Sequence, residues 1–125
     1  MIIKESAENY LESIFMLKNQ LGRVRSIDIA NDLSVSKPSV SVAMKNFREE
    51  GYITVDVDGY IDLTEKGLEI ANRVYERHEV IAKALEALGV SRQTALDDSC
   101  KIEHVISDES FSKIKDFINS KSNNK

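Results

Sequence analysis

Apolar residues recur at helical spacing over most of the chain, so the sequence predicts a mostly α-helical protein. The first predicted helix covers residues 5–20, and its buried face consists of Tyr10, Leu11, Ile14 and Leu17. Gly22 then ends this helix. Ser26 is a suitable N-cap for a second, shorter helix that runs to Leu33.

A third helix is predicted from Ser36 to about Glu50, after a turn of only three residues. Ser36 can cap this helix, and Pro38 suits its first turn because an N–H group there needs no helical partner. Gly51 can adopt the left-handed conformation that ends a helix. The second and third helices are thus close enough along the chain to form a helix-turn-helix.

Apolar and polar residues alternate between Tyr52 and Leu63, which predicts two short strands. Asp58-Gly59 is a strong signal for a two-residue hairpin turn between them, and residues 23–25 are a candidate for a further short strand. Short helix, turn, helix and hairpin follow one another in the order of a winged helix-turn-helix. We therefore predict a DNA-binding domain of this kind over residues 1–72.

The third helix has two faces of different character. Val40, Met44 and Phe47 fall within about 60° of one another on a helical wheel and form its predicted core face. The opposite face is small, polar and lightly basic, which suits insertion into a major groove. The candidate DNA contacts are Arg25, Ser36, Lys37, Pro38, Ser39, Ser41, Val42 and Lys45. The alternative is an ordinary helical hairpin with a solvated face.

Charge is unevenly distributed along this half of the chain, whose overall net charge is −4. Six basic residues stand against two acids from Lys18 to Arg48, but seven acids stand against one lysine from Glu49 to Glu69. A local basic segment can still attract phosphate, because salt screens charges beyond roughly 10 Å. Three aspartates of the hairpin would repel phosphate: Asp56, Asp58 and Asp62. We therefore expect the wing to add little affinity for DNA.

The second half of the chain is predicted to be entirely helical. A long helix opens at Thr64 and reaches about Leu88, Ser91 can cap a second helical stretch to Ile106, and Ser107 can cap the last helix. We assign residues 73–119 to a metal-binding and dimerisation domain and residues 120–125 to a flexible tail. More apolar side chains occur here than about 50 residues can bury alone, which predicts a homodimer with two recognition helices for a pseudo-palindromic operator in double-stranded DNA.

The only cysteine, Cys100, stands at helical spacing from Glu103 and His104. The three residues occupy about 100° of a helical wheel, so a thiolate, a carboxylate and an imidazole share one face. Such a set can supply three ligands of a first-row transition-metal site. Taken singly, each residue is more ordinary, since a lone cysteine is usually a small buried apolar group.

Three further residues can complete this set if the helices converge. His78 lies on the long helix, and Asn9 and Glu12 lie on one polar face of the first helix. A metal that joins the first helix to the second half of the chain would fix the angle of the recognition helices. This arrangement would be a switch that couples metal binding to DNA binding.

The chain resembles the diphtheria toxin repressor and manganese transport regulator family of metal-dependent repressors. The resemblance extends to about residue 119 and rests on ENYLESIFML at 8–17, IANDL at 29–33, LTEKG at 63–67, RHE at 77–79 and CKIEHVIS at 100–107. It implies a winged helix, a helical dimerisation domain and Fe(II)- or Mn(II)-activated repression of metal-uptake genes. In length the chain is similar to the two-domain, manganese type.

The resemblance also implies a mixed ligand set. Cys100 stands where the iron-type proteins have Cys and the manganese type has Glu, whereas Glu12 and His78 stand at positions that the manganese type uses. Asn9 replaces an Asp of the manganese type and a Met of the iron type. A thiolate favours Fe(II), Co(II), Ni(II) or Zn(II) over Mn(II), so we favour Fe(II) as the effector.

Two other functions stay open. One is a winged-helix regulator whose metal site is vestigial or purely structural, which Asn9 suggests. The other is a metal-dependent enzyme in which Cys100 and His104 act as nucleophile and base. We expect neither enzymatic activity nor a small organic substrate, because the chain offers no Gly-rich phosphate loop and no orienting third residue. With no long apolar run and no signal-peptide core, we expect a cytoplasmic protein without membrane contact.

Overall fold

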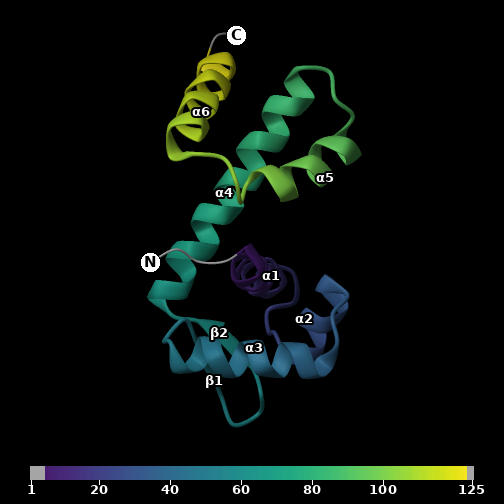
Figure 1. Cartoon of the computed structure of the whole chain (residues 1–125), viewed down its shortest axis with the longest axis vertical. Coiled ribbons are helices and arrows are strands. Elements are labelled where there is room, and N and C mark those ends of the chain that lie inside the picture. Colours follow the sequence, from purple (N-terminus) through teal and green to yellow (C-terminus); the bar gives the residue numbers. More distant parts are fainter. Residues whose placement is uncertain (1–4, 124–125) are drawn as a thin grey trace. The chain divides into compact units, whose positions relative to one another are not determined.

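The computed structural model describes residues 5–123, and within them the chain forms six helices and one two-stranded antiparallel sheet (Figure 1). The elements are α1 (Glu5–Leu21), α2 (Ser26–Leu33), α3 (Lys37–Glu49), β1 (Ile53–Val55), β2 (Ile61–Leu63), α4 (Glu65–Ala87), α5 (Arg92–Ile102) and α6 (Asp108–Asn123). The predicted mostly helical fold class is confirmed. Contacts divide the chain into two compact units, and the boundary along the sequence falls between Asn72 and Arg73.

The first unit has one apolar core to which every one of its elements contributes. Leu11 and Ile14 of α1 are three residues apart and almost fully buried, as one face of an amphipathic helix requires. Ile29 of α2 and the paired strands' Ile53 and Ile61 pack into the same core. Figure 1 shows α1, α2 and α3 gathered with the hairpin around it. This core holds α3 in place, so that one of its faces is buried and the other is free.

The turn between α2 and α3 has the predicted length and capping. Ser34 has the left-handed φ of 55° that ends α2, and Ser36 accepts a hydrogen bond from the Ser39 N–H at 3.2 Å. The start of α2 differs by one residue from the prediction, since Arg25 rather than Ser26 occupies the N-cap position. The Asp28 carboxylate accepts the Arg25 N–H at 2.9 Å, and this bond fixes the boundary.

The hairpin has a three-residue loop instead of the predicted two-residue turn. Ile53 pairs with Leu63, and the Asp56 N–H still donates to the Tyr60 carbonyl at 3.0 Å. Val57 and Asp58 form the turn, and Gly59, with φ of 85°, follows in the left-handed region. The Asp56 carboxylate accepts the N–H groups of Asp58 and Tyr60, both at 2.9 Å, and so stabilises the longer loop.

The candidate strand at residues 23–25 does not form as a strand. It makes a single ladder-like contact, in which the Ile61 N–H donates to the Val24 carbonyl at 2.7 Å. Val24 is fully buried, while Arg23 and Arg25 on either side of it are exposed. The segment therefore alternates like a strand but is anchored to the hairpin by one bond.

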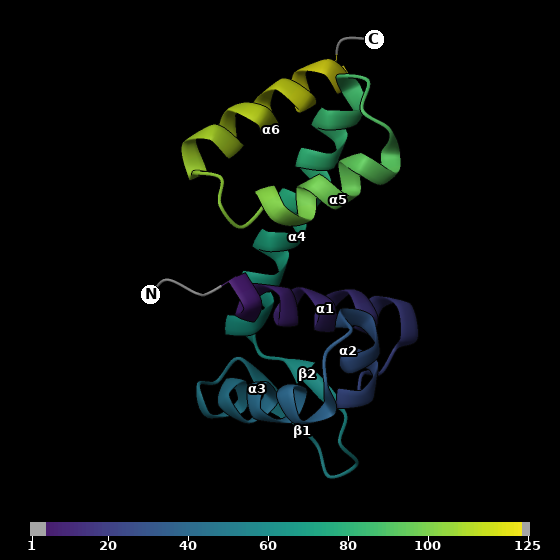
Figure 2. The same cartoon turned by 45° about the vertical axis from the view of Figure 1, so that its right-hand side comes forward.

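In the second unit, α5 and α6 both lie beside the later part of α4 (Figure 2). α5 ends at Ile102, four residues before the predicted end, and a turn connects it to α6. α6 continues to Asn123, so residues 120–123 of the predicted flexible tail are helical, and 124–125 lie outside the described residues. None of the helices within residues 5–123 has the length and apolarity that crossing a membrane requires.

Candidate metal centre and DNA-binding surface

The donor groups of the second unit meet where α4 passes the end of α5. His78 Nδ1 lies 3.0 Å from Glu103 Oε2, 2.9 Å from Ser99 Oγ and 3.7 Å from Cys100 Sγ. Ser99 lies in the last turn of α5 and Glu103, four residues later, is the C-cap residue of this helix; both side chains are buried. Cys100 is an exposed residue, although the contact of its sulfur with His78 Nδ1 is partly buried. An imidazole, a carboxylate and a thiol are thus within reach of one another.

His104 approaches the same carboxylate from the other side. Its Nε2 lies 3.3 Å from Glu103 Oε1, and the His104 side chain is only 1% exposed. Among the described residues, Glu103 Oε1 receives no hydrogen bond, although the Glu103 side chain is fully buried. A buried carboxylate is unfavourable unless a cation or hydrogen-bond donors compensate its charge. Glu103 therefore has the environment of a carboxylate that a cation can stabilise.

The spacing of these donors fits a transition-metal site. Two ligands bound to one ion at about 2.0–2.3 Å lie roughly 3.0–3.7 Å apart. The observed separations, from 3.0 Å for His78 and Glu103 to 3.7 Å for His78 and Cys100, fall in this range. Nitrogen, oxygen and sulfur together suit a borderline ion such as Fe(II), Co(II) or Zn(II). The residues present in the second unit therefore fit the metal that the sequence analysis expects.

The backbone that carries Cys100, Glu103 and His104 differs from the predicted helix, because α5 ends at Ile102. The Glu103 N–H still donates to the Ser99 carbonyl at 3.0 Å, but the His104 N–H turns to the Lys101 carbonyl at 3.4 Å. The helix thus tightens as it ends, and His104 leaves the regular face. Val105, in the turn beyond α5, is 78% exposed.

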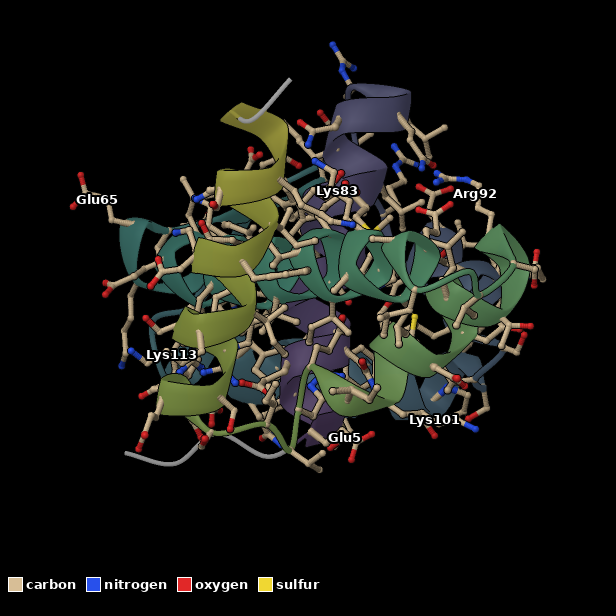
Figure 3. The ribbon with its side chains drawn as sticks, turned by 90° about the horizontal axis from the view of Figure 1, so that it is seen from above. Glu5, Glu65, Lys83, Arg92, Lys101 and Lys113 are labelled. Atoms are coloured by element: carbon tan, nitrogen blue, oxygen red, sulfur yellow. The ribbon has the colours of Figure 1, made fainter. Side chains whose placement is uncertain are left out.

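Ser99 is a member of this cluster that sequence reasoning missed. It is fully buried, and its hydroxyl oxygen lies 2.9 Å from His78 Nδ1. Its hydroxyl also donates to the Leu96 carbonyl at 3.0 Å. The available signal was its position four residues before Glu103, on the same face of the helix. Lys101, on the other side of α5, extends outward from the helix (Figure 3).

The candidate ligands Asn9 and Glu12 belong to α1 in the first unit. The second unit brings together the other four candidates: His78, Cys100, Glu103 and His104.

The candidate DNA contacts of α3 lie on its exposed face. Val40, Met44 and Phe47 are buried, whereas Val42 is 61% exposed. The other exposed candidates on the helix are Lys37, Pro38, Ser39, Ser41 and Lys45. The Ser36 hydroxyl is engaged in capping and lies 2.8 Å from the Ser39 hydroxyl, so this pair is a fixed part of the surface.

Arg25, the remaining candidate, lies beside the hairpin. Its guanidinium carbon is 4.5 Å from the centre of the Tyr60 ring, and that of Arg23 is 5.0 Å from the same ring. A hydrogen bond from Arg23 and the charge of Arg25 lower the pKa of the Tyr60 phenol from its usual value. Arg23 and Tyr60 were not predicted as part of this surface, and the alternation of residues 23–25 was the available signal for Arg23.

The acidic residues of the hairpin are partly engaged within the unit. Lys18 of α1 forms an ion pair with Asp62, and the Asp56 carboxylate accepts two backbone N–H groups of the loop. Two of the three aspartates expected to repel phosphate thus have partners. The small contribution expected of the wing stays a prediction, and the two arginines beside Tyr60 argue against it.

Comparison with known proteins identifies both halves of the chain. Residues 3–62 match the N-terminal DNA binding domain of iron dependent repressors, and residues 64–124 match their metal binding and dimerisation domain. Such a combination defines a metal-responsive DNA-binding regulator. The chain belongs to the iron-dependent repressor family, in which the sequence analysis expected it.

Individual relatives agree with this assignment. The chain is 32% identical over 118 residues to an HTH-type transcriptional regulator of Methanocaldococcus jannaschii, covering 93% of this chain and 94% of the relative. It is 34% identical over 113 residues to the HTH-type transcriptional regulator MntR of Bacillus pumilus, covering 90% of this chain and 78% of the relative. Both relatives are named as regulators of transcription.

A solved structure shows the same arrangement of elements. The manganese regulator SloR superposes with a TM-score of 0.77 and 28% sequence identity over 90% of this chain. The match covers 53% of SloR, so this chain spans about half the length of that protein. The likeness therefore concerns the DNA-binding and metal-binding halves described above.

Proposed function

We propose that this protein is a DNA-binding transcriptional repressor of metal-uptake genes that Fe(II) or Mn(II) activates. The observation that carries the proposal is the cluster of His78, Glu103, His104 and Cys100 in the half that matches a metal binding domain. Relatives named for manganese regulation, MntR and SloR, support a metal as the effector.

The metal ligands we propose are Glu12, His78, Cys100, Glu103 and His104, with Asn9 as the sixth. A bound divalent ion would supply positive charge to the buried carboxylate and coordination bonds to both units of the chain. Because Glu12 and Asn9 belong to the unit that holds α3, ligation by either would restrict the position of the recognition helix. Such a restriction is how metal binding would favour DNA binding.

Fe(II) is the effector that the donor set favours. The thiolate of Cys100 is a softer ligand than the carboxylates that suit Mn(II). The relatives named above point instead to manganese, so Mn(II) is the second choice. Zn(II), Co(II) and Ni(II) also suit nitrogen and sulfur donors and belong in any test.

We further propose that the protein binds double-stranded operator DNA as a homodimer. The match to a dimerisation domain supports this assembly, as do exposed apolar side chains of the second unit: Leu88, Val105 and Phe117. Two copies would present two α3 helices to half-sites one helical turn apart. On α3 the contacts would come from Lys37, Pro38, Ser39, Ser41, Val42 and Lys45, with Ser36 and Arg25 beside them.

A regulator that binds DNA without metal is the second candidate. One observation favours it: Ser99 and Glu103 already engage His78 Nδ1 at 2.9 Å and 3.0 Å, so the buried cluster has internal partners. In that case the cluster would serve stability alone. Asn9, in place of a more usual metal ligand, points in the same direction.

Fluorescence anisotropy with the DNA upstream of the protein's own gene distinguishes the two candidates. Titrations run anaerobically, at one salt concentration, with chelator, Mn(II), Fe(II) or Zn(II), since salt alone changes such affinities by orders of magnitude. Tight binding only with metal is the expected result, and the metal effective at the lowest concentration would be the effector. Equal binding in chelator would favour the metal-independent regulator.

A further inference from the structure

Arg77 precedes His78 on α4, and its guanidinium group reaches the turn between α5 and α6. Nη1 donates to the carbonyl oxygen of Ile106 at 2.8 Å and lies 3.4 Å from the carbonyl oxygen of Glu103. Arg77 is only 9% exposed, so these are bonds of a largely buried cation. One side chain therefore holds the backbone at both ends of the turn that carries His104.

The other edge of the same guanidinium holds the start of α6. Nη2 donates to the carboxylate of Asp108, the first residue of α6, and the guanidinium carbon lies 5.3 Å from the centre of the Phe111 ring. The Asp108 side chain is 94% exposed, so the ion pair by itself adds little to the stability of the fold. Together with the ring contact, however, it fixes the plane of the guanidinium.

The turn needs a group of this shape. Carbonyl groups at the end of a helix lack helical partners and must find other donors. Arginine offers a planar set of N–H groups that can reach two carbonyls and a carboxylate together, whereas lysine is a compact charge without a fixed fork. Arg77 is therefore not interchangeable with lysine.

We propose that Arg77 is a positioning residue for the metal site. It joins α4, which carries His78, to the turn that carries Glu103 and His104, and these are the segments whose donors lie 3.0–3.3 Å apart. The inference rests on the proposed function, since it takes these residues as ligands. Groups that orient ligands typically change metal affinity by 10–100-fold when they are removed.

The test is a titration of the full chain with Co(II), followed by the visible absorption of the bound ion. Arg77→Lys should weaken Co(II) binding about 10- to 100-fold and change the absorption spectrum at saturation. Arg92→Lys is the matched control, because Arg92 is an exposed arginine of the same unit whose partner, Glu86, lies 3.5 Å away. It should leave affinity and spectrum unchanged.

A purely structural role for Arg77 would give another result. The metal-free Arg77→Lys protein would melt at a lower temperature by circular dichroism, while Co(II) affinity and spectrum stayed those of the wild type. This outcome would overturn the proposal. Failure of the wild-type protein to bind Co(II) would overturn the proposed function as well, so the two failures are distinguishable.

A second variant covers the case in which Arg77→Lys does not fold. Asp108→Asn removes the charge that orients Nη2 but leaves the bonds of Nη1 to the two carbonyls. The Asp108 side chain is exposed, so the Asp108→Asn protein should still fold. We expect Co(II) binding to weaken several-fold, and wild-type affinity in this variant would contradict the proposal.

Discussion

A Cβ atom placed on Gly67 would lie 2.1 Å from the carbonyl oxygen of Tyr52. The first turn of α4 therefore packs directly on the backbone that enters β1. Thr64 strengthens this junction, since its hydroxyl donates to the Gly51 carbonyl at 2.6 Å and its N–H to the Tyr52 carbonyl at 3.0 Å. The LTEKG segment at residues 63–67 is thus explained by the close approach of helix and hairpin.

Replacement of Gly67 by alanine should destabilise the first unit. The methyl group cannot fit without moving the Tyr52 backbone, and such overpacking typically costs about 1–3 kcal/mol or more. Urea denaturation followed by circular dichroism measures the free energy of unfolding. Glu69→Ala, at an exposed position of the same helix, should change it by less than about 0.5 kcal/mol. An unchanged free energy of unfolding for Gly67→Ala would contradict this prediction and would mean that the Tyr52 backbone shifts at little cost.

His104→Ala should abolish metal-induced binding to the operator. The variant removes one donor beside Glu103 and leaves a buried carboxylate with fewer neutralising partners. We expect the affinity for the operator in the presence of metal to fall by at least about 100-fold. This loss is larger than the 10- to 100-fold effect that is typical when a group that only orients a ligand is removed. Anisotropy in chelator and in metal measures the difference, and circular dichroism checks the fold. Unchanged metal-induced binding would remove His104 from the ligand set.

The elements of the first unit could be predicted from the sequence because their signals are local. Ser36 caps α3, and Val40 and Phe47 alternate at helical spacing with exposed residues. The hairpin loop was wrong by one residue, because the side chain of Asp56 favours a longer loop that the Asp58-Gly59 pair does not reveal. The boundary of a strand or helix that depends on one side-chain hydrogen bond cannot be predicted from the spacing of apolar residues.

The metal site could be predicted as a set of residue types but not as a geometry. Cys100, Glu103 and His104 were found by helical spacing, although α5 ends at Ile102 and His104 lies in the turn beyond it. Ser99 and Arg77 were missed as parts of the site. Their roles depend on contacts with α4 and α6 that are distant in the sequence.

Arg25→Ala should weaken binding to operator and unrelated DNA to a similar extent. A guanidinium beside the hairpin can contact phosphate, so its loss should also reduce the slope of log K against log salt by about 1. Anisotropy at several salt concentrations gives this slope. Arg92→Ala, an exposed arginine of the second unit, is the control and should leave it unchanged. An unaltered slope for Arg25→Ala would support the expectation that the wing adds little.

Tyr60 should titrate below the usual pKa of a phenol. Arg23 donates to the phenol and Arg25 adds positive charge, and both favour the phenolate over the neutral form. Because the pKa of Tyr60 is lowered in the folded protein, any stability from this contact is present at high pH and is lost as the pH falls through the folded pKa. NMR of tyrosine ring carbons can follow this residue among the four tyrosines. Arg23→Gln should raise the midpoint, and an unchanged midpoint would contradict the assigned contact.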